Sequence, residues 1–198
     1  MQSLFIDCEN NTCRRRTLLV NVLPVKTPLM KAFEMSHPLT CDLCDAHKNS
    51  AADVFRVLPP VFKSFGAHSR FSGLISTVQC FEDNSHVKAA VDEPGLGRVL
   101  VVDGGGSLRK ALLGGNLGAA AARNGWAGVV IDGCVRDVAE LAQCTVGIRA
   151  LASMPMPTEK RQQGLRDVAV QIQGVWVKPG EWLCADEDGI VVSAQPLA

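Results

Sequence analysis

Two short apolar segments with a helix of small residues between them constrain the fold most strongly. Residues 98–103 (RVLVVD) and 127–132 (AGVVID) each have the length of a buried strand. The segment between them, 117–124 (LGAAAARN), predicts a helix, and Gly125 follows at a position where helices commonly end in glycine. Strand, helix and strand in this order indicate a parallel βαβ unit, whose small side chains let the helix lie close to the sheet. An all-helical bundle is excluded, and an α/β protein with a mixed sheet is expected.

The segments around this unit predict mostly strands. Short helices are expected at 40–47, with Thr40 as the N-cap, and at 86–93 and 138–142. We expect the glycines at 104–106 to end the strand 98–103, and 133–137 to form a loop. Apolar or β-branched runs indicate further strands at 55–58, 70–81, 147–151, 168–172, 174–177, 182–185 and 190–193.

The first 38 residues differ from the rest of the chain. They contain three prolines, the basic triplet Arg14–Arg16 and no regular hydrophobic period. We therefore expect 1–38 to be a poorly ordered N-terminal extension and 39–198 to form a single domain.

Composition narrows the class of function. The 20 basic and 20 acidic residues give a formal net charge of zero, so nothing draws the chain toward nucleic acid or an anionic membrane. No apolar run approaches the roughly 18 residues of a membrane span. The eight cysteines are spread over a chain large enough to fold without disulfides, so we expect reduced thiols and a cytoplasmic protein. The single CxxC at 41–44 is a weak zinc pattern and is interpreted as two semi-buried thiols on a helix.

Three motifs, two of glycines and one of charged residues, are candidates for a binding or catalytic site. Gly104–Gly106 follows a strand but lacks the third glycine of a dinucleotide fingerprint, since Arg109 stands in its place. Gly114-Gly115 stands at a helix start, which is either an ordinary start or an anion site built from free N–H groups. Arg136-Asp137 follows a buried strand. Arginine can hold a carboxylate and aspartate can bind Mg²⁺ or Mn²⁺, although an exposed ion pair in a loop would have the same sequence.

Several motifs in the same order resemble the class II aldolase and regulator-of-ribonuclease-activity-A family over residues 39–198. They are 80–84 (CFEDN), 97–109 (GRVLVVDGGGSLR), 124–130 (NGWAGVV), 133–137 (GCVRD) and 178–186 (KPGEWLCAD). The resemblance implies a three-layer β/β/α fold of the swivelling-domain type, assembled as a homotrimer. It also implies a divalent-metal-dependent lyase that splits 4-hydroxy-4-methyl-2-oxoglutarate into two pyruvates and decarboxylates oxaloacetate.

The same resemblance assigns roles to residues. The substrate arginine falls on Arg136 and the metal-binding aspartate on Asp137, and both are expected to be catalytic. The substrate-binding loop falls on Gly114, Gly115, Asn116 and Leu117.

The chain departs from the family at position 115. Catalytic members usually have an acid there, and this chain has Gly115. Asp103 and Asp132 are candidates to replace that acid.

Two other functions stay open. The resemblance also covers regulators that bind and inhibit an endoribonuclease without catalysis, for which a nuclease would be the partner. Regulators without aldolase activity lack the acid after the arginine, so Asp137 favours the enzyme. Methyl transfer in menaquinone synthesis is an older name for this family, and no glycine-rich methyl-donor site supports it here.

Overall fold

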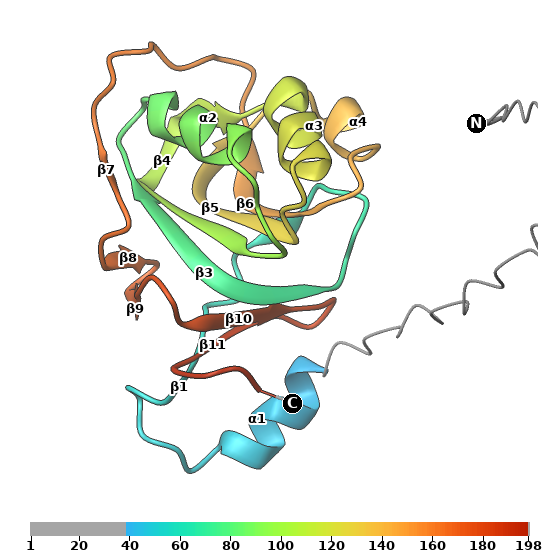
Figure 1. The fold of residues 1–198 in the computed structure, drawn as a ribbon, viewed down its shortest axis with the longest axis vertical. Coiled ribbons are helices and arrows are strands. Elements are labelled where there is room, and N and C mark those ends of the chain that lie inside the picture. Colours follow the sequence, from blue (N-terminus) through green and yellow to red (C-terminus); the bar gives the residue numbers. More distant parts are fainter. Residues whose placement is uncertain (1–38, 198) are drawn as a thin grey trace, which may run out of the picture. The chain divides into compact units, whose positions relative to one another are not determined.

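Strands dominate the computed structural model, which describes residues 39–197 (Figure 1). The extension expected at 1–38 lies outside the described residues. The elements are α1 (Thr40–His47), β1 (Phe55–Val57), β2 (Lys63–Ser64), β3 (Phe71–Gln79), α2 (Ser85–Asp92), β4 (Val99–Leu113), α3 (Gly115–Arg123), β5 (Gly128–Val135), α4 (Val138–Leu141), β6 (Gly147–Ser153), β7 (Leu165–Arg166), β8 (Val170–Ile172), β9 (Val175–Val177), β10 (Trp182–Ala185) and β11 (Ile190–Ser193).

One mixed sheet organises the domain. Its parallel centre is β3-β4-β5-β6, and β2 pairs antiparallel with β6 at one edge. On the other side of β3 the sheet continues through antiparallel β10, β11 and β1. The strand β7 pairs with β3, and β8 and β9 form a separate antiparallel hairpin. The predicted βαβ unit is confirmed, since β4 and β5 are parallel and α3 joins them.

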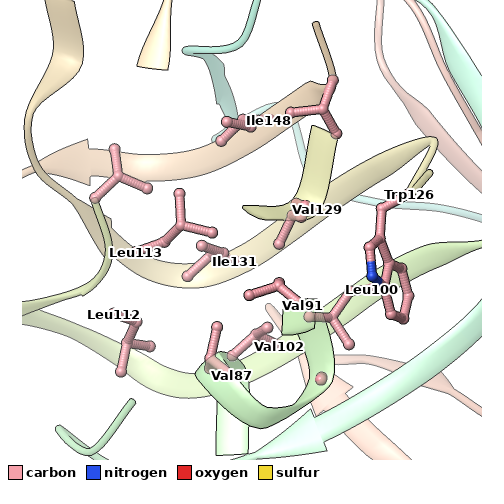
Figure 2. Packing of buried hydrophobic residues seen from close by; sticks show 14 of the residues in the cluster. Val87, Val91, Leu100, Val102, Leu112, Leu113, Trp126, Val129, Ile131 and Ile148 are labelled. Carbon is pink, nitrogen blue, oxygen red and sulfur yellow. The ribbon is translucent and has the colours of Figure 1, made fainter. Parts of the chain in front are cut away.

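The parallel strands bury a different core on each face. On one face, side chains of α2 such as Val87 and Val91 pack on Leu100 and Val129 of the sheet (Figure 2). Ala121 of α3 belongs to the same cluster. On the opposite face, alternate side chains of the same strands pack against apolar residues of β8, β9, β10 and β11. Helices, sheet and a second layer of strands therefore form the expected three-layer β/β/α arrangement.

The strands β4 and β5 both run further than the sequence predicts. The glycines at 104–106 do not end β4, which continues to Leu113 with register shifts beginning between Asp103 and Ser107. Gly105 and Gly106 have positive φ angles of 64° and 65°, which glycine adopts at little cost, so the strand bulges there and continues. The predicted loop at 133–137 is strand as far as Val135. These extensions determine where the candidate site forms.

Helix α1 begins differently from the prediction. Its N-cap is Leu39, with no side-chain cap, and not Thr40. The backbone N–H and the hydroxyl of Thr40 both donate to the carboxylate of Asp186, at 2.7 and 2.6 Å. A carboxylate 146 residues away in the sequence thus satisfies the helix start and fixes α1 beside β10 and β11. Among residues 39–197, no helix has the length and apolar character needed to cross a membrane.

Candidate active site

The two motifs singled out in the sequence meet because β4 and β5 end side by side. Leu113, the last residue of β4, pairs with Val135, the last residue of β5. The backbone N–H of Arg136 donates to the carbonyl of Leu113 at 2.9 Å. The start of α3 at Gly115 therefore lies beside Arg136 and Asp137, at the carboxyl end of parallel strands, where α/β proteins commonly bind ligands.

The carboxylate of Asp137 is bound to the N-terminus of α3. Its Oδ2 accepts the N–H of Gly115 at 3.2 Å and lies 3.5 Å from Nε of Arg136. The Asp137 backbone is left-handed, with φ 56° and ψ 46°, a conformation that aspartate tolerates better than most residues. About two-fifths of the Arg136 and Asp137 side chains stay exposed, so both are available to a ligand.

Both glycines at the start of α3 lie against side chains of the Arg136–Glu140 segment. Gly114 is extended, with φ −134°, which any residue can adopt. A Cβ on Gly114 would lie 2.5 Å from Oδ2 of Asp137, and a Cβ on Gly115 would lie 1.8 Å from Oε2 of Glu140. Real Cβ atoms essentially never approach another atom so closely. The glycine pair therefore makes room for two carboxylates.

Glu140 is the site residue that the sequence reasoning missed. It lies on α4, and its backbone N–H donates to the carbonyl of Asp137 at 2.9 Å. Its carboxylate occupies the space where a side chain at position 115 would begin. The sequence contains one signal for Glu140, which is its position three residues after Asp137. Residues three apart at a helix start lie on the same side of the helix. The acid absent from α3 is thus replaced in space by one from α4.

The other two residues of the predicted substrate loop differ in how exposed their side chains are. Asn116 is exposed and lines a groove of about 460 Å³ that continues along α3 and past Glu140. Leu117 is half-buried against the helix-side core, and its N–H donates to the carbonyl of Gly114 at 3.0 Å. Substrate contacts at both residues stay predictions.

Asp103 and Asp132 do not replace the missing acid, contrary to the sequence hypothesis. They continue the side-chain alternation of β4 and β5 on the face that packs against β8–β11. The Asp132 carboxylate accepts the Gln173 side-chain amide at 2.7 Å, and burial raises its pKa. Asp103 accepts the Gln79 side-chain amide at 3.3 Å. Their carboxylates therefore belong to a separate polar group that closes the strand-side core.

The cysteine in the site segment is not a nucleophile. Cys134 is fully buried, and burial raises the pKa of its thiol. A reactive cysteine requires an accessible, readily ionised thiol.

The described residues contain no group of three or more His, Cys, Asp or Glu side chains arranged to hold a metal ion. This donor set still fits Mg²⁺, which is commonly bound by one or two carboxylates and completes its octahedral shell with water and substrate oxygens. The exposed carboxylate of Asp137 meets that requirement, and Glu140 supplies a second carboxylate beside Gly115.

Comparison with known proteins identifies the family. The family model RraA-like, described as Aldolase/RraA, matches residues 40–192. This chain belongs to the RraA-like family. A relative from Albidiferax ferrireducens, named as a candidate 4-hydroxy-4-methyl-2-oxoglutarate aldolase, is 70% identical over 166 residues, which cover 80% of this chain and 96% of the relative.

Two solved structures resemble the fold of this RraA-like chain. The RNA-processing inhibitor RraA of Thermus thermophilus is 46% identical, with a TM-score of 0.77 over 81% of this chain and 95% of that one. A Geobacillus kaustophilus protein titled S-adenosylmethionine: 2-dimethylmenaquinone methyltransferase is 42% identical, with a TM-score of 0.75 over 81% of this chain and 97% of that one. The mixed α/β fold of the family is therefore the fold of this chain.

Proposed function

We propose that this protein is a divalent-metal-dependent lyase that cleaves 4-hydroxy-4-methyl-2-oxoglutarate into two molecules of pyruvate, with oxaloacetate decarboxylation as a secondary activity. One observation carries the proposal: the side chains of Arg136, Asp137 and Glu140 converge on the N-terminus of α3 at Gly115. The name of the Albidiferax ferrireducens relative supports the same substrate.

Each group has a distinct task in this proposal. Arg136 holds a substrate carboxylate through two parallel hydrogen bonds. The backbone N–H groups at the start of α3 stabilise negative charge on the substrate, as helix N-termini do for anions. Glu140 accepts the proton of the 4-hydroxyl as the bond between C3 and C4 breaks, and a proton returned to C3 completes the methyl group of pyruvate.

Asp137, with Glu140 near it, would hold the metal ion, Mg²⁺ or Mn²⁺. When bound, the metal supplies a Lewis acid that withdraws electrons from the 2-oxo group. Decarboxylation of oxaloacetate leaves the same electron pair on the carbon next to a 2-oxo group, so the same residues serve both reactions.

A coupled pyruvate-release assay tests the proposal. The full chain is supplied with either 2-oxo acid and with Mg²⁺, Mn²⁺ or EDTA, beside Arg136→Ala and Asp137→Ala. Asp92→Asn, a change at an exposed acid on α2 that pairs with Lys88, is the control. We expect metal-dependent turnover that both site variants lose and the control keeps. Turnover in EDTA equal to that with metal would refute metal dependence.

The second candidate function is inhibition of an endoribonuclease, favoured by the similarity to the RNA-processing inhibitor of Thermus thermophilus. Asp137 supports the enzyme over this role, because regulators without aldolase activity lack an acid after the arginine. If neither substrate is turned over, binding to an endoribonuclease and inhibition of RNA cleavage become the decisive measurements.

We further propose a cytoplasmic homotrimer that binds neither nucleic acid nor membranes. The family resemblance supports the trimer, and the zero net charge supports the absence of nucleic-acid binding. Light scattering coupled to size-exclusion chromatography tests the trimer directly, because a trimer of this 21.2 kDa chain has three times the monomer mass.

A further inference from the structure

A second cavity lies where β3 ends beside β4, and it shares no residue with the site at Arg136, Asp137 and Glu140. Its volume is about 460 Å³, and its lining includes Gln79, Phe81, Asp103, Gly105, Gln163 and Gly164. Gln79 is the last residue of β3 and pairs with Asp103 of β4. The cavity therefore lies at the carboxyl end of a parallel strand, where α/β proteins commonly bind ligands, and its volume is in the range of small-molecule sites.

The carboxylate of Asp103 is the charged group of this cavity. Its Oδ1 accepts the N–H of Gly105 at 3.0 Å, and its Oδ2 accepts the side-chain amide of Gln79 at 3.3 Å. These two bonds fix the position of the side chain, which is only 9% exposed. Because each carboxylate oxygen can accept a second hydrogen bond, Asp103 can still bind a donor that enters the cavity.

The electrostatic environment of the cavity is negative. Among residues 39–197, no lysine, arginine or histidine forms an ion pair with Asp103 or with the buried Asp83. Burial, together with the nearby charges of Asp103 and Asp83, raises the pKa of the Cys80 thiol in the cavity wall to about 12. Buried charges in proteins are normally paired, so these surroundings favour a cationic ligand.

The ring of Phe81 favours a planar cation. The side chain is half-exposed, and the guanidinium of Arg109 lies over its ring with Cζ 5.7 Å from the ring centroid. The charge of Arg109 is itself paired, because its Nε donates to Glu82 at 2.6 Å. Guanidinium groups both stack on aromatic rings and bind carboxylates through two parallel hydrogen bonds. An aromatic ring and a buried carboxylate in one cavity therefore match this group.

The wall opposite in sequence, at Gln163 and Gly164, is anchored in the interior of the domain. The buried carboxylate of Asp83 accepts the backbone N–H of Arg161 at 2.7 Å and that of Gln163 at 3.1 Å. These bonds hold the segment 161–164 in place, so the cavity has a defined wall on this side. The side chain of Gln163 itself is exposed.

We propose that this cavity binds a small molecule that carries an alkylguanidinium group. The guanidinium donates hydrogen bonds to Asp103 and contacts the ring of Phe81, and the alkyl part occupies the rest of the cavity. The volume of the cavity indicates a small molecule and not the arginine of a protein partner. The site lies outside the proposed lyase site, and the inference does not rest on the proposed function.

Isothermal titration calorimetry of the full chain with butylguanidinium tests the inference, with N-butylurea as an uncharged analogue of nearly the same shape. We expect butylguanidinium to bind the wild type at least about ten-fold more tightly than N-butylurea, because only the cation makes charged hydrogen bonds. Asp103→Asn keeps the shape of the side chain and should weaken butylguanidinium binding at least about ten-fold. Asp92→Asn removes an exposed carboxylate on α2 and is the matched control, for which we expect unchanged affinity.

A variant on the opposite wall makes the test independent of changes at Asp103. Because Gln163 is exposed, Gln163→Lys should leave the fold intact while it adds an ammonium group at the cavity. We expect this change to weaken butylguanidinium binding at least about ten-fold by repulsion between like charges. Gln163→Met, of similar length and without charge, is its control and should bind nearly as the wild type does. Circular dichroism shows whether each variant is folded.

Four results would overturn the inference. They are no binding of butylguanidinium to the wild type up to the solubility of the probe, equal affinity for N-butylurea, unchanged affinity in both folded Asp103→Asn and folded Gln163→Lys, and an equal loss in Asp92→Asn. The last result would show attraction to the overall charge and not to this cavity. Pyruvate release is not part of any of these measurements, so their outcome is independent of the proposed lyase activity.

Discussion

The relocated acid at Glu140 gives the sharpest prediction about catalysis. Changing Glu140 to Gln keeps the size of the side chain and removes its ability to accept a proton. A positioned acid or base commonly contributes about 10²- to 10⁴-fold to a rate, so we expect kcat for 4-hydroxy-4-methyl-2-oxoglutarate to fall by at least ~10²-fold. Stability should change by less than about 0.5 kcal/mol, because Glu140 is exposed.

The reciprocal change tests the geometry. A Cβ at position 115 would lie 1.8 Å from Oε2 of Glu140 and 2.8 Å from both its Cβ and its Cδ. Rotation of the carboxylate relieves the first of these contacts but does not move the Glu140 Cβ, so Gly115→Ala must displace α4. Overpacking of this kind costs about 1–3 kcal/mol of stability.

Moving the acid back to α3 should restore activity. Gly115→Asp combined with Glu140→Gly places a carboxylate at position 115 and removes every Glu140 atom that would clash with it. Steady-state pyruvate release should show at least ten-fold more activity in this double variant than in Glu140→Gly alone, with Asp92→Asn as the unaffected control. The reasoning is refuted if folded Glu140→Gln keeps more than a third of the wild-type kcat.

Three further predictions concern stability. Gly118→Ala would place a Cβ 2.6 Å from Cδ2 of Leu141, so urea denaturation should show a loss of about 1–3 kcal/mol, and unchanged stability would contradict the packing of α3 on α4. Burial raises the pKa of Asp83, but hydrogen bonds from Ser85 and from the backbone N–H groups of Arg161 and Gln163 outweigh it and lower the pKa to about 2. Its stabilisation is therefore present above the unfolded pKa near 4 and is lost as pH falls toward 2, a decline that urea midpoints should show and that Asp83→Asn should lack. Burial raises the pKa of Asp132, so Asp132→Asn should leave the thermal midpoint unchanged or higher at pH 7, and a large decrease would show that its charge stabilises the fold.

Local patterns were sufficient for much of the fold. The apolar runs at 98–103 and 127–132 form the first parts of β4 and β5, and Gly125, with φ 74°, follows the end of α3 as predicted. These features could be predicted because each is determined by residues close together in the sequence. A short apolar run indicates a buried strand, and a glycine just after a helix readily adopts the positive φ angle that ends it. The family motifs added the three-layer arrangement, which local patterns could not supply.

The incorrect predictions from the sequence share a physical cause, because each of these features depends on contacts between residues that are distant in the sequence. The glycines at 104–106 looked like a strand end, but pairing with β5 carries β4 past them to Leu113. Thr40 looked like a helix cap, but it donates to Asp186 near the other end of the chain. Glu140 lies beside Gly115 only because α4 packs against α3. The sequence alone therefore indicates a missing acid at position 115, whereas in the structure the absence of a side chain there leaves room for the Glu140 carboxylate.

The most direct test of the central claim is the fate of the substrate itself. Proton nuclear magnetic resonance can follow 4-hydroxy-4-methyl-2-oxoglutarate with the wild-type chain, first in EDTA and then after excess Mg²⁺. The account predicts no reaction in EDTA, followed by the release of two pyruvates for each substrate molecule consumed once Mg²⁺ is present. Substrate that persists with Mg²⁺ at the rate of the protein-free control would contradict it.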